Sequence, residues 1–199
     1  MHQEDLVQAV LGRIFVELEA SGRHVHVTRE QAITLFGHPL TPSRPLSQPG
    51  QFLARERVTL VGPKGEFRDV AVLGPERKEA QVEVSLTDAR TLGLQVPIRL
   101  SGAVSGSPGA TLIGELGRIQ LDSGVIAAQR HIHLTPEAAE HFGVRDKQVV
   151  SLKTYTARPT VFQDVVVRVR PDFAPYAHLD YDEANACGFA KGDLGRILP

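Results

Sequence analysis

Residues 130–143 read RHIHLTPEAAEHFG, and residues 23–37 read RHVHVTREQAITLFG. Both stretches follow the pattern Arg-His-x-His-x-Thr-x-Glu-x-Ala, and both end in Phe-Gly. Apolar residues alternate with the two histidines, which is typical of a β-strand, and the threonine that follows is a preferred helix N-cap. The sequence therefore predicts one unit used twice: a strand carrying two histidines, a cap at Thr28 or Thr135, and a short helix.

The two histidines of each copy lie two residues apart. Side chains at positions i and i+2 of a strand point to the same side. We therefore expect His24 to face the same way as His26, and His131 the same way as His133. Each copy then presents a pair of imidazoles on one side of its strand.

The composition excludes several classes of protein. The chain has 199 residues, which suits two small domains or one of medium size. Its net charge is −1 without a basic run, so nothing indicates nucleic acid or an anionic membrane as a partner. Cys187 is the only cysteine, which excludes an internal disulfide and fits a reducing compartment. No stretch is apolar enough to span a membrane.

The N-terminal segment, residues 1–13, contains apolar residues at helical spacing between residues 4 and 12. It predicts a short amphipathic helix, which either packs against the body of the protein or docks onto a larger assembly. From Ile14 the pattern changes to alternation, so we expect a strand that runs into the first histidine pair.

Short elements fill the first half of the chain. Residues 58–61 and 67–73 flank a Gly-Pro-Lys-Gly turn and predict a β-hairpin. Residues 82–86 alternate and predict a further strand, after which Thr87 opens a short helix that closes at Gly93.

Two loops and two strands complete the expected organisation. The prolines of residues 39–49 prevent regular structure, and such a loop either shapes a ligand pocket or simply connects. Residues 101–109 are rich in serine and glycine, so they either present backbone N–H groups to an anion or form a flexible linker. Residues 112–119 and 124–128 predict strands that lead into the second histidine pair.

A second repeat extends the duplication. Residues 67–70 (FRDV) correspond to residues 162–165 (FQDV) with a shift of 95 positions, and the helical stretches that follow repeat with the same shift. Applied to the strand between these stretches, the same shift makes Glu83 correspond to His178. Both side chains can bind a metal ion, so each histidine pair gains a candidate third ligand.

These residue types point to zinc. Two imidazoles with a carboxylate, or three imidazoles, are familiar zinc ligands, and three ligands leave a coordination position open for catalysis. A single His-x-His is more often a satisfied surface or core pair, but its duplication with matched third ligands favours metal. Iron, nickel or cobalt could use the same donors. A duplicated fold can bring two equivalent sites together, which makes a two-metal site plausible. His2, His38 and His141 fall outside the pattern and are assigned to the surface or to local capping.

Arg77 lies six residues before Glu83, just after a Gly-Pro turn. At that separation it can hold an anion such as phosphate near a ligand, through a bidentate contact. From the residues alone a solvated surface arginine is the better interpretation.

Several motifs, in order along residues 14–197, resemble those of the PduL-type phosphate propanoyltransferases, the phosphotransacylases associated with bacterial microcompartments. The motifs are RHVHVT, RPLSQPGQF, VLGPERKEAQVEVS, SGSPGA, RHIHLTPEAAEHFG and FQDVVVRVRPDFAPYAHLDYDEANACG. The resemblance implies a mainly β fold of two pseudo-symmetric β-barrels capped by short helices, with two zinc ions at their junction. It implies the reversible conversion of acyl-CoA and phosphate into acyl phosphate and CoA.

The resemblance also implies roles for single residues. One metal would be held by His24, His26 and Glu83, and the other by His131, His133 and His178. Arg77 would contact phosphate, which overturns the surface interpretation. The residues expected to line the CoA channel are Ser21, Arg44, Leu73 and Asn185.

The resemblance further predicts the domains and partners. Residues 14–22 would join residues 129–199 in one barrel, and residues 23–128 would form the other. Similar proteins form dimers, so we expect a homodimer, in a microcompartment lumen or the cytoplasm, with microcompartment shell or lumen enzymes as possible partners. Gly22, Ala71 and Leu86 depart from residues common in the family, and none of them is a proposed ligand.

The combined expectation is a metal-dependent phosphotransacylase for propanoyl-CoA or a similar short chain. One zinc would polarise the thioester carbonyl while Arg77 and the metals orient phosphate. No Ser-His-Asp set is evident, and Cys187 lies in a short helix where burial is expected, so direct transfer without an acyl-enzyme is favoured. Two rivals stay open: a metal-dependent hydrolase of a phosphate ester or thioester, and a non-catalytic interaction protein of a microcompartment shell with structural metals.

Overall fold

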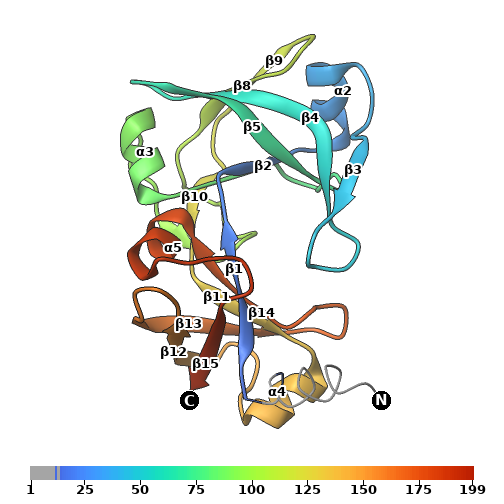
Figure 1. The fold of residues 1–199 in the computed structure, drawn as a ribbon. Coiled ribbons are helices and arrows are strands. Elements are labelled where there is room, and N and C mark those ends of the chain that lie inside the picture. Colours follow the sequence, from blue (N-terminus) through green and yellow to red (C-terminus); the bar gives the residue numbers. More distant parts are fainter. Residues whose placement is uncertain (1–11, 13) are drawn as a thin grey trace. The chain divides into compact units, whose positions relative to one another are not determined.

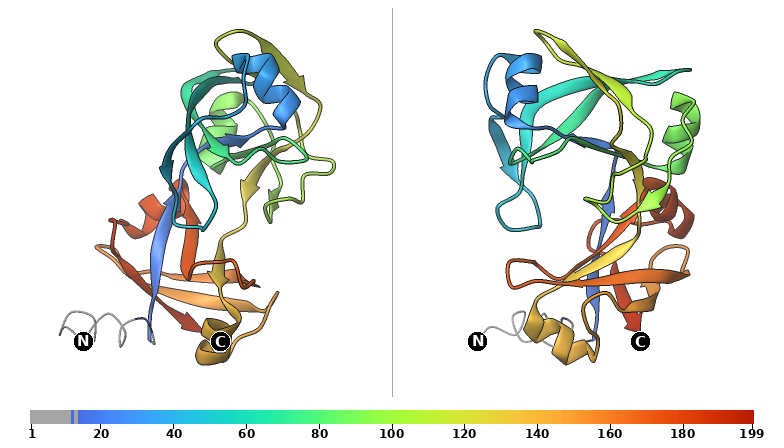
Figure 2. Two further views of the ribbon diagram at one scale, coloured as in Figure 1. Left: turned by 90° about the vertical axis from the view of Figure 1, so that its right-hand side faces the viewer. Right: turned by 180° about the vertical axis from the view of Figure 1, so that it is seen from behind.

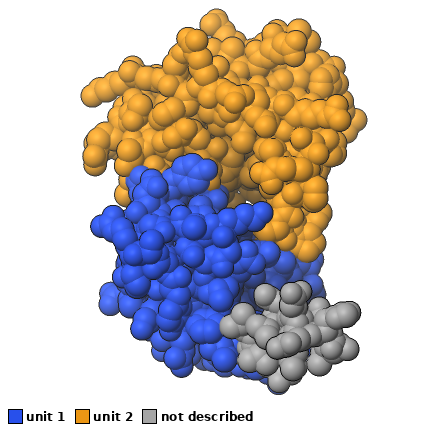
Figure 3. Space-filling model, in the orientation of Figure 1, with its two compact units in different colours: residues 1–21, 129–199 blue, residues 22–128 orange. Residues whose placement is uncertain are grey.

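The computed structural model describes residues 12 and 14–199 (Figure 1). The chain divides into two compact units, shown in different colours in Figure 3. Unit 1 combines the residues up to Ser21 with Gln129–Pro199, and unit 2 is the continuous segment Gly22–Ala128. The helix expected within residues 1–13 lies outside the described residues.

Unit 1 is a closed β-barrel of six strands with two short helices, α4 (Pro136–Phe142) and α5 (Tyr181–Cys187). In barrel order its strands are β1 (Val16–Ser21), β14 (Tyr176–Asp180), β11 (His131–Leu134), β13 (Val161–Val169), β12 (Val149–Tyr155) and β15 (Leu194–Leu198). Strand β1 comes first in the sequence but pairs with β14 and β15, two of the last strands. Closure leaves this barrel without an open edge.

Unit 2 is a sheet that curls into a half-barrel, with α2 (Arg29–Phe36) and α3 (Leu86–Leu92) (Figure 2). Its strands, in sheet order, are β7 (Ile98–Arg99), β10 (Val125–Ala128), β6 (Gln81–Val84), β2 (His24–His26), β5 (Glu66–Gly74), β4 (Phe52–Val61), β8 (Ala110–Ile113) and β9 (Arg118–Leu121), with β3 (Pro42–Pro45) paired to β4. The expected mainly β fold with short helices is confirmed. The unit 2 sheet is open, with β7 and β9 at the ends of its strand order and β3 at a further edge beside β4.

The expected helix starts are confirmed in both copies of the repeat. The Thr28 side chain accepts a hydrogen bond from the Gln31 N–H, and Thr135 accepts one from the Ala138 N–H. The start expected at Thr87 is wrong, because α3 is capped by Ser85, two residues earlier. Asp88 is the reason: its carboxylate accepts from the Ser85 N–H and completes a reciprocal capping box.

Other local expectations fared differently. The hairpin predicted around residues 62–65 is confirmed as β4 and β5, which pair antiparallel. The proline-rich loop contains an ordered strand, β3, against expectation; it is an exposed edge strand, where a proline removes no needed hydrogen bond. The single strand expected over residues 112–119 is two strands, β8 and β9, joined by a turn.

The register of the strands reproduces the duplication. His24 on β2 lies directly opposite Glu83 on the antiparallel strand β6. His131 on β11 lies directly opposite His178 on the antiparallel strand β14. Each histidine strand therefore has the candidate third ligand as its cross-strand neighbour, at equivalent positions of the two units.

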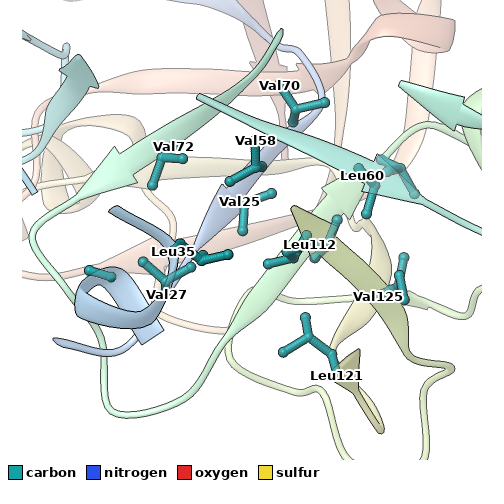
Figure 4. Close-up of a cluster of buried hydrophobic side chains, with 14 of the residues drawn as sticks. Val25, Val27, Leu35, Val58, Leu60, Val70, Val72, Leu112, Leu121 and Val125 are labelled. Atoms are coloured by element: carbon teal, nitrogen blue, oxygen red, sulfur yellow. The ribbon is translucent and has the colours of Figure 1, made fainter. Parts of the chain in front are cut away.

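The residues between the histidines point into the hydrophobic cores. Val25 is fully buried in the core of unit 2, where it lies among strand residues such as Val72 and Leu60 and the helix residue Leu35 (Figure 4). Ile132 takes the same position in the core of unit 1. Since side chains alternate along a strand, burial of this central residue directs both neighbouring histidines to the opposite side of the sheet.

In unit 2, an arginine fastens the histidine strand to the helix start. Arg23 donates two hydrogen bonds to the Asp88 carboxylate, at 2.7 and 3.0 Å, and its guanidinium lies 4.1 Å from the centroid of the Phe67 ring. Asp88 is the capping-box residue of α3. The contact thus connects the residue before His24 to the first turn of α3, the helix that follows β6 in the chain.

Unit 1 contains the same contact. Arg130 donates to the Glu183 carboxylate at 2.7 Å, and its guanidinium lies 5.8 Å from the centroid of the Phe162 ring. Glu183 is the capping-box residue of α5. We call this Arg–carboxylate–Phe contact the brace of each unit.

Replacing the brace arginine is expected to destabilise its unit. For Arg130→Met we expect the free energy of unfolding to fall by about 2 kcal/mol, because Glu183 loses a charged donor while its side chain stays only 17% exposed. Urea denaturation in the presence of a chelator measures this. The control is Arg68→Met. Arg68 forms an ion pair with Glu66, but its side chain is 84% exposed, so the free energy of unfolding should fall by less than about 0.5 kcal/mol. Equal effects would contradict the brace.

No helix among the described residues is long and apolar enough to cross a membrane.

Candidate metal centres

Unit 2 gathers three possible metal ligands. His24 and His26 come from β2 and Glu83 from β6, and one donor atom from each lies within 4.8 Å of the others. All three residues are buried, with exposed fractions between 2% and 8%. The alternation of β2 and its pairing with β6 bring them together.

Backbone carbonyls orient both imidazoles of this group. The Nδ1–H of His24 donates to the Gly22 carbonyl at 2.8 Å, and that of His26 donates to the Leu73 carbonyl at 3.1 Å. A carbonyl only accepts, so Nδ1 carries the proton in both rings, and Nε2 keeps the lone pair that a metal would need. Nε2 of His24 lies 3.6 Å from Oε2 of Glu83.

The environment of His26 favours its neutral form. Burial lowers the pKa of His26 well below its ordinary value, and the neighbouring His24 and Arg77 lower it further. Metal ligation requires the unprotonated ring, so the environment favours the ligand form of His26 at neutral pH.

Unit 1 gathers an equivalent group of three imidazoles. His131 and His133 come from β11 and His178 from β14, again with donor atoms within 4.8 Å of one another. The Nδ1–H of His131 donates to the Gln129 carbonyl at 2.8 Å, as His24 does in unit 2. Nδ1 of His178 lies 3.2 Å from a carboxylate oxygen of Glu19, a contact that favours the tautomer with Nε2 as ligand atom.

His133 provides the test of whether a metal fits. Both of its ring nitrogens are buried, and neither has a hydrogen-bond partner among the described residues. Burial, with His131 and Arg168 nearby, lowers the pKa of His133 to about 2, so protonation does not satisfy the ring. Phe173 stacks on it with the ring centroids 3.9 Å apart, which shields it from water. A metal ion bound at one of these nitrogens would give such an imidazole a partner.

Both groups therefore fit zinc by the chemistry of their donors. Nitrogen and carboxylate ligands in threes match zinc sites in which a fourth position takes water or substrate. That these six residues are ligands remains a prediction, and the geometry supplies its support.

The structure places Arg77 beside the unit 2 group. Its backbone N–H donates to the Val27 carbonyl at 2.9 Å, directly after the histidine strand, and its side chain donates to the Ser101 hydroxyl at 3.2 Å. The charge of Arg77 contributes to the lowered pKa of His26. Arg77 is thus partly buried and adjacent to the candidate ligands, and its contact with phosphate stays a prediction.

Of the four residues predicted to contact CoA, two lie in each unit. Arg44 on β3 and Leu73 on β5 both pair with Leu53 of β4, so they share one row of the unit 2 sheet. In unit 1, Ser21 ends β1, and Asn185 lies exposed in α5. Their role in binding CoA remains a prediction.

Sequence reasoning missed three residues around the candidate ligands: Gln81, Ser101 and Glu19. Gln81 is only 2% exposed, and its side-chain amide donates to Glu83 at 2.5 Å and to Ser101 at 2.8 Å. Strand alternation could have identified Gln81, which lies two residues before Glu83. Ser101 comes close only through the folded loop.

Cys187 is expected to be unreactive and dispensable. It is fully buried at the end of α5, and burial raises the pKa of its thiol, so at pH 8 the group is protonated as well as inaccessible. Iodoacetamide at pH 8 should label it in urea but not in the native protein, as mass spectrometry can show. Cys187→Ala should keep the phosphate-dependent activity expected from the sequence resemblance within about two-fold, and a loss beyond 100-fold would indicate a covalent role.

The family model described as phosphate propanoyltransferase matches residues 17–190. A protein of that name from Clostridioides difficile strain 630 is 50% identical over 197 residues, covering 98% of this chain and 94% of the relative. Another, from Thermotoga maritima, is 51% identical over 181 residues, covering 89% and 86%. A match over most of the chain, at half identity, shows that this protein belongs to the phosphate propanoyltransferase family of acyltransferases.

Proposed function

We propose that this protein is a phosphate acyltransferase that converts propanoyl-CoA, or a similar short-chain acyl-CoA, and phosphate into acyl phosphate and CoA. Each candidate group, one in each unit, would hold one zinc ion. The observation that carries the proposal is the repeated geometry: two groups of three donors at equivalent register positions, one with Arg77 beside it.

The residues of the chain would divide the work as follows. Zinc, when bound, supplies a Lewis acid that polarises an oxygen of the substrate. Arg77 holds phosphate through its planar guanidinium and orients one oxygen toward the thioester carbonyl carbon. That oxygen forms the new C–O bond, the C–S bond breaks, and CoA leaves as its thiolate. The buried, protonated Cys187 takes no part, so the acyl group passes directly to phosphate.

The proposal also covers CoA binding, the oligomeric state, the location and the partners of the protein. Ser21, Arg44, Leu73 and Asn185 would contact CoA, with the exposed cation of Arg44 suited to its phosphates. The protein would act as a homodimer in a microcompartment lumen or the cytoplasm. Shell or lumen enzymes of the microcompartment would be its partners.

A thiol-release assay tests the function. Zinc-loaded protein is mixed with propanoyl-CoA, with and without phosphate, and free CoA and acyl phosphate are measured. We expect CoA release to depend on phosphate and to match acyl phosphate formation one to one. Equal release without phosphate would indicate a hydrolase. Two bound zinc ions with no release under either condition would favour a non-catalytic protein.

A further inference from the structure

The carboxylate of Glu83 is held on one side by a buried amide. Nε2 of Gln81 donates to Oε1 of Glu83 at 2.5 Å, while Oε2 lies 3.6 Å from Nε2 of His24. Gln81 is 2% exposed and lies two residues before Glu83 on β6, so both side chains face the same way. The two oxygens of Glu83 therefore have different neighbours: one faces an amide donor and the other faces an imidazole.

The orientation of the Gln81 amide is fixed by the backbone. The N–H of Gly102 donates to Oε1 of Gln81 at 2.7 Å. A flipped amide would place its NH₂ group against this N–H and its oxygen against the Glu83 carboxylate, and both contacts would be repulsive. Nε2 must therefore face Glu83, as the hydrogen-bond pattern requires.

The same amide reaches Arg77 through a hydroxyl. Oγ of Ser101 accepts from Nε2 of Gln81 at 2.8 Å and from Nη1 of Arg77 at 3.2 Å. Amide NH₂ and guanidinium groups only donate, so Ser101 must accept from both, and its own proton points elsewhere. A continuous chain of hydrogen bonds thus runs from Glu83 through Gln81 and Ser101 to Arg77.

We propose that Gln81 and Ser101 are positioning residues that connect the candidate zinc ligand Glu83 to the anion-binding side chain of Arg77. Gln81 occupies Oε1 and so leaves Oε2 for the metal. Ser101 orients the guanidinium of Arg77 toward the anion. The proposal rests on the proposed function for the identities of metal and anion.

Unit 1 lacks this chain at the equivalent position. Gln81 lies opposite His26 in the register of β2 and β6, and the matching position opposite His133 is occupied by Tyr176. Tyr176 hydrogen-bonds to Glu17, and its ring lies 6.4 Å from that of the candidate ligand His178, a contact that a phenylalanine would keep. A substitution of Tyr176 therefore provides a matched control: it changes a side chain at the equivalent register position that does not take part in the hydrogen-bond chain to Arg77.

The metal half of the proposal is tested with Gln81→Met, which keeps the volume and removes the amide. The full-length protein is equilibrated with a series of zinc buffers, and bound zinc per chain is measured. We expect one zinc to bind about 10–100-fold more weakly and the other to be unchanged. Tyr176→Phe should bind both ions as the unmodified protein does. Wild-type affinity for both ions in Gln81→Met would overturn the role of Gln81.

The anion half is tested with Ser101→Ala on zinc-loaded protein. Calorimetric titration with inorganic phosphate should show about five-fold weaker binding, with both zinc ions retained, and Ser101→Thr should restore most of the affinity. In turnover, the KM for phosphate should rise while the KM for acyl-CoA stays constant. Ser105→Ala, an exposed serine in the same loop, is the control.

The outcomes separate this proposal from the proposed function. If unmodified protein binds zinc and phosphate but transfers no acyl group, the function fails, and the two binding tests still decide the roles of Gln81 and Ser101. If Gln81→Met does not fold by circular dichroism, Ser101→Ala decides. Unchanged phosphate binding in Ser101→Ala would overturn the connection to Arg77.

Discussion

His133→Ala is expected to reduce the bound zinc from two ions per chain to one and to lower phosphate-dependent CoA release by at least about 10³-fold. Loss of one of three ligands removes the ion at low free zinc, and with it a Lewis acid worth several kcal/mol in the transition state. The buried ring of His133 has no other partner for its nitrogens among the described residues, so no protein contact substitutes for the lost ligation. Metal analysis and the thiol-release assay measure both effects.

The matched variant and the control sharpen this prediction. His26→Ala should remove the other zinc and lower activity similarly, because it is the equivalent ligand in unit 2. His38→Ala should change neither quantity, since His38 is exposed and its contacts with the Pro39 carbonyl and Glu56 lie outside both candidate groups. A His133→Ala protein that kept two zinc ions and full activity would remove the basis of the proposed centre.

Arg77→Lys is expected to raise the KM for phosphate strongly and to lower kcat/KM for phosphate by about 100-fold, while the KM for acyl-CoA stays within about two-fold. Lysine keeps the charge but loses the planar pair of donors that a phosphate group accepts. It also cannot reproduce the contact of the guanidinium with Ser101. Initial rates with each substrate varied in turn measure the split.

The neighbouring lysine provides the control for charge. Lys78 is exposed, and Lys78→Gln should alter kcat/KM for phosphate by less than about two-fold. If Arg77→Lys and Lys78→Gln had equal, small effects, Arg77 would be an ordinary surface cation, and the interpretation made from the residues alone would return.

The features that could be predicted from the sequence are those formed by residues a few positions apart in the chain. The caps at Thr28 and Thr135 are of this kind, since each needs only a short side chain before a helix. The pairing of Glu83 with His24 could be anticipated only because the duplication supplied a second copy, with His178 at the matching shift. Without that repeat, a glutamate in an alternating strand would have carried no signal.

The rest depends on contacts between distant segments. Ser101 reaches Gln81 across about 20 positions through a loop that a flexible linker would resemble in composition. The strand β3 forms despite its prolines because β4 offers an edge, which no local pattern reveals. The Ser85 cap was missed because Thr87 and Asp88 together look like a helix start. In the structure Asp88 is instead the third residue of the helix that Ser85 caps.

The pairing of β1 with β14 and β15 has a consequence for synthesis of the protein. The ribosome releases β1 before unit 2, but the partners of β1 emerge only after the whole of unit 2, since Val16 pairs with Gly195. Unit 2 is continuous and can complete its sheet while β1 still has no neighbours. Until then the nascent chain carries an unpaired strand, which is a site for chaperones or for mispairing with another chain. A stop codon before β14 would therefore spare unit 2 and leave unit 1 without a barrel.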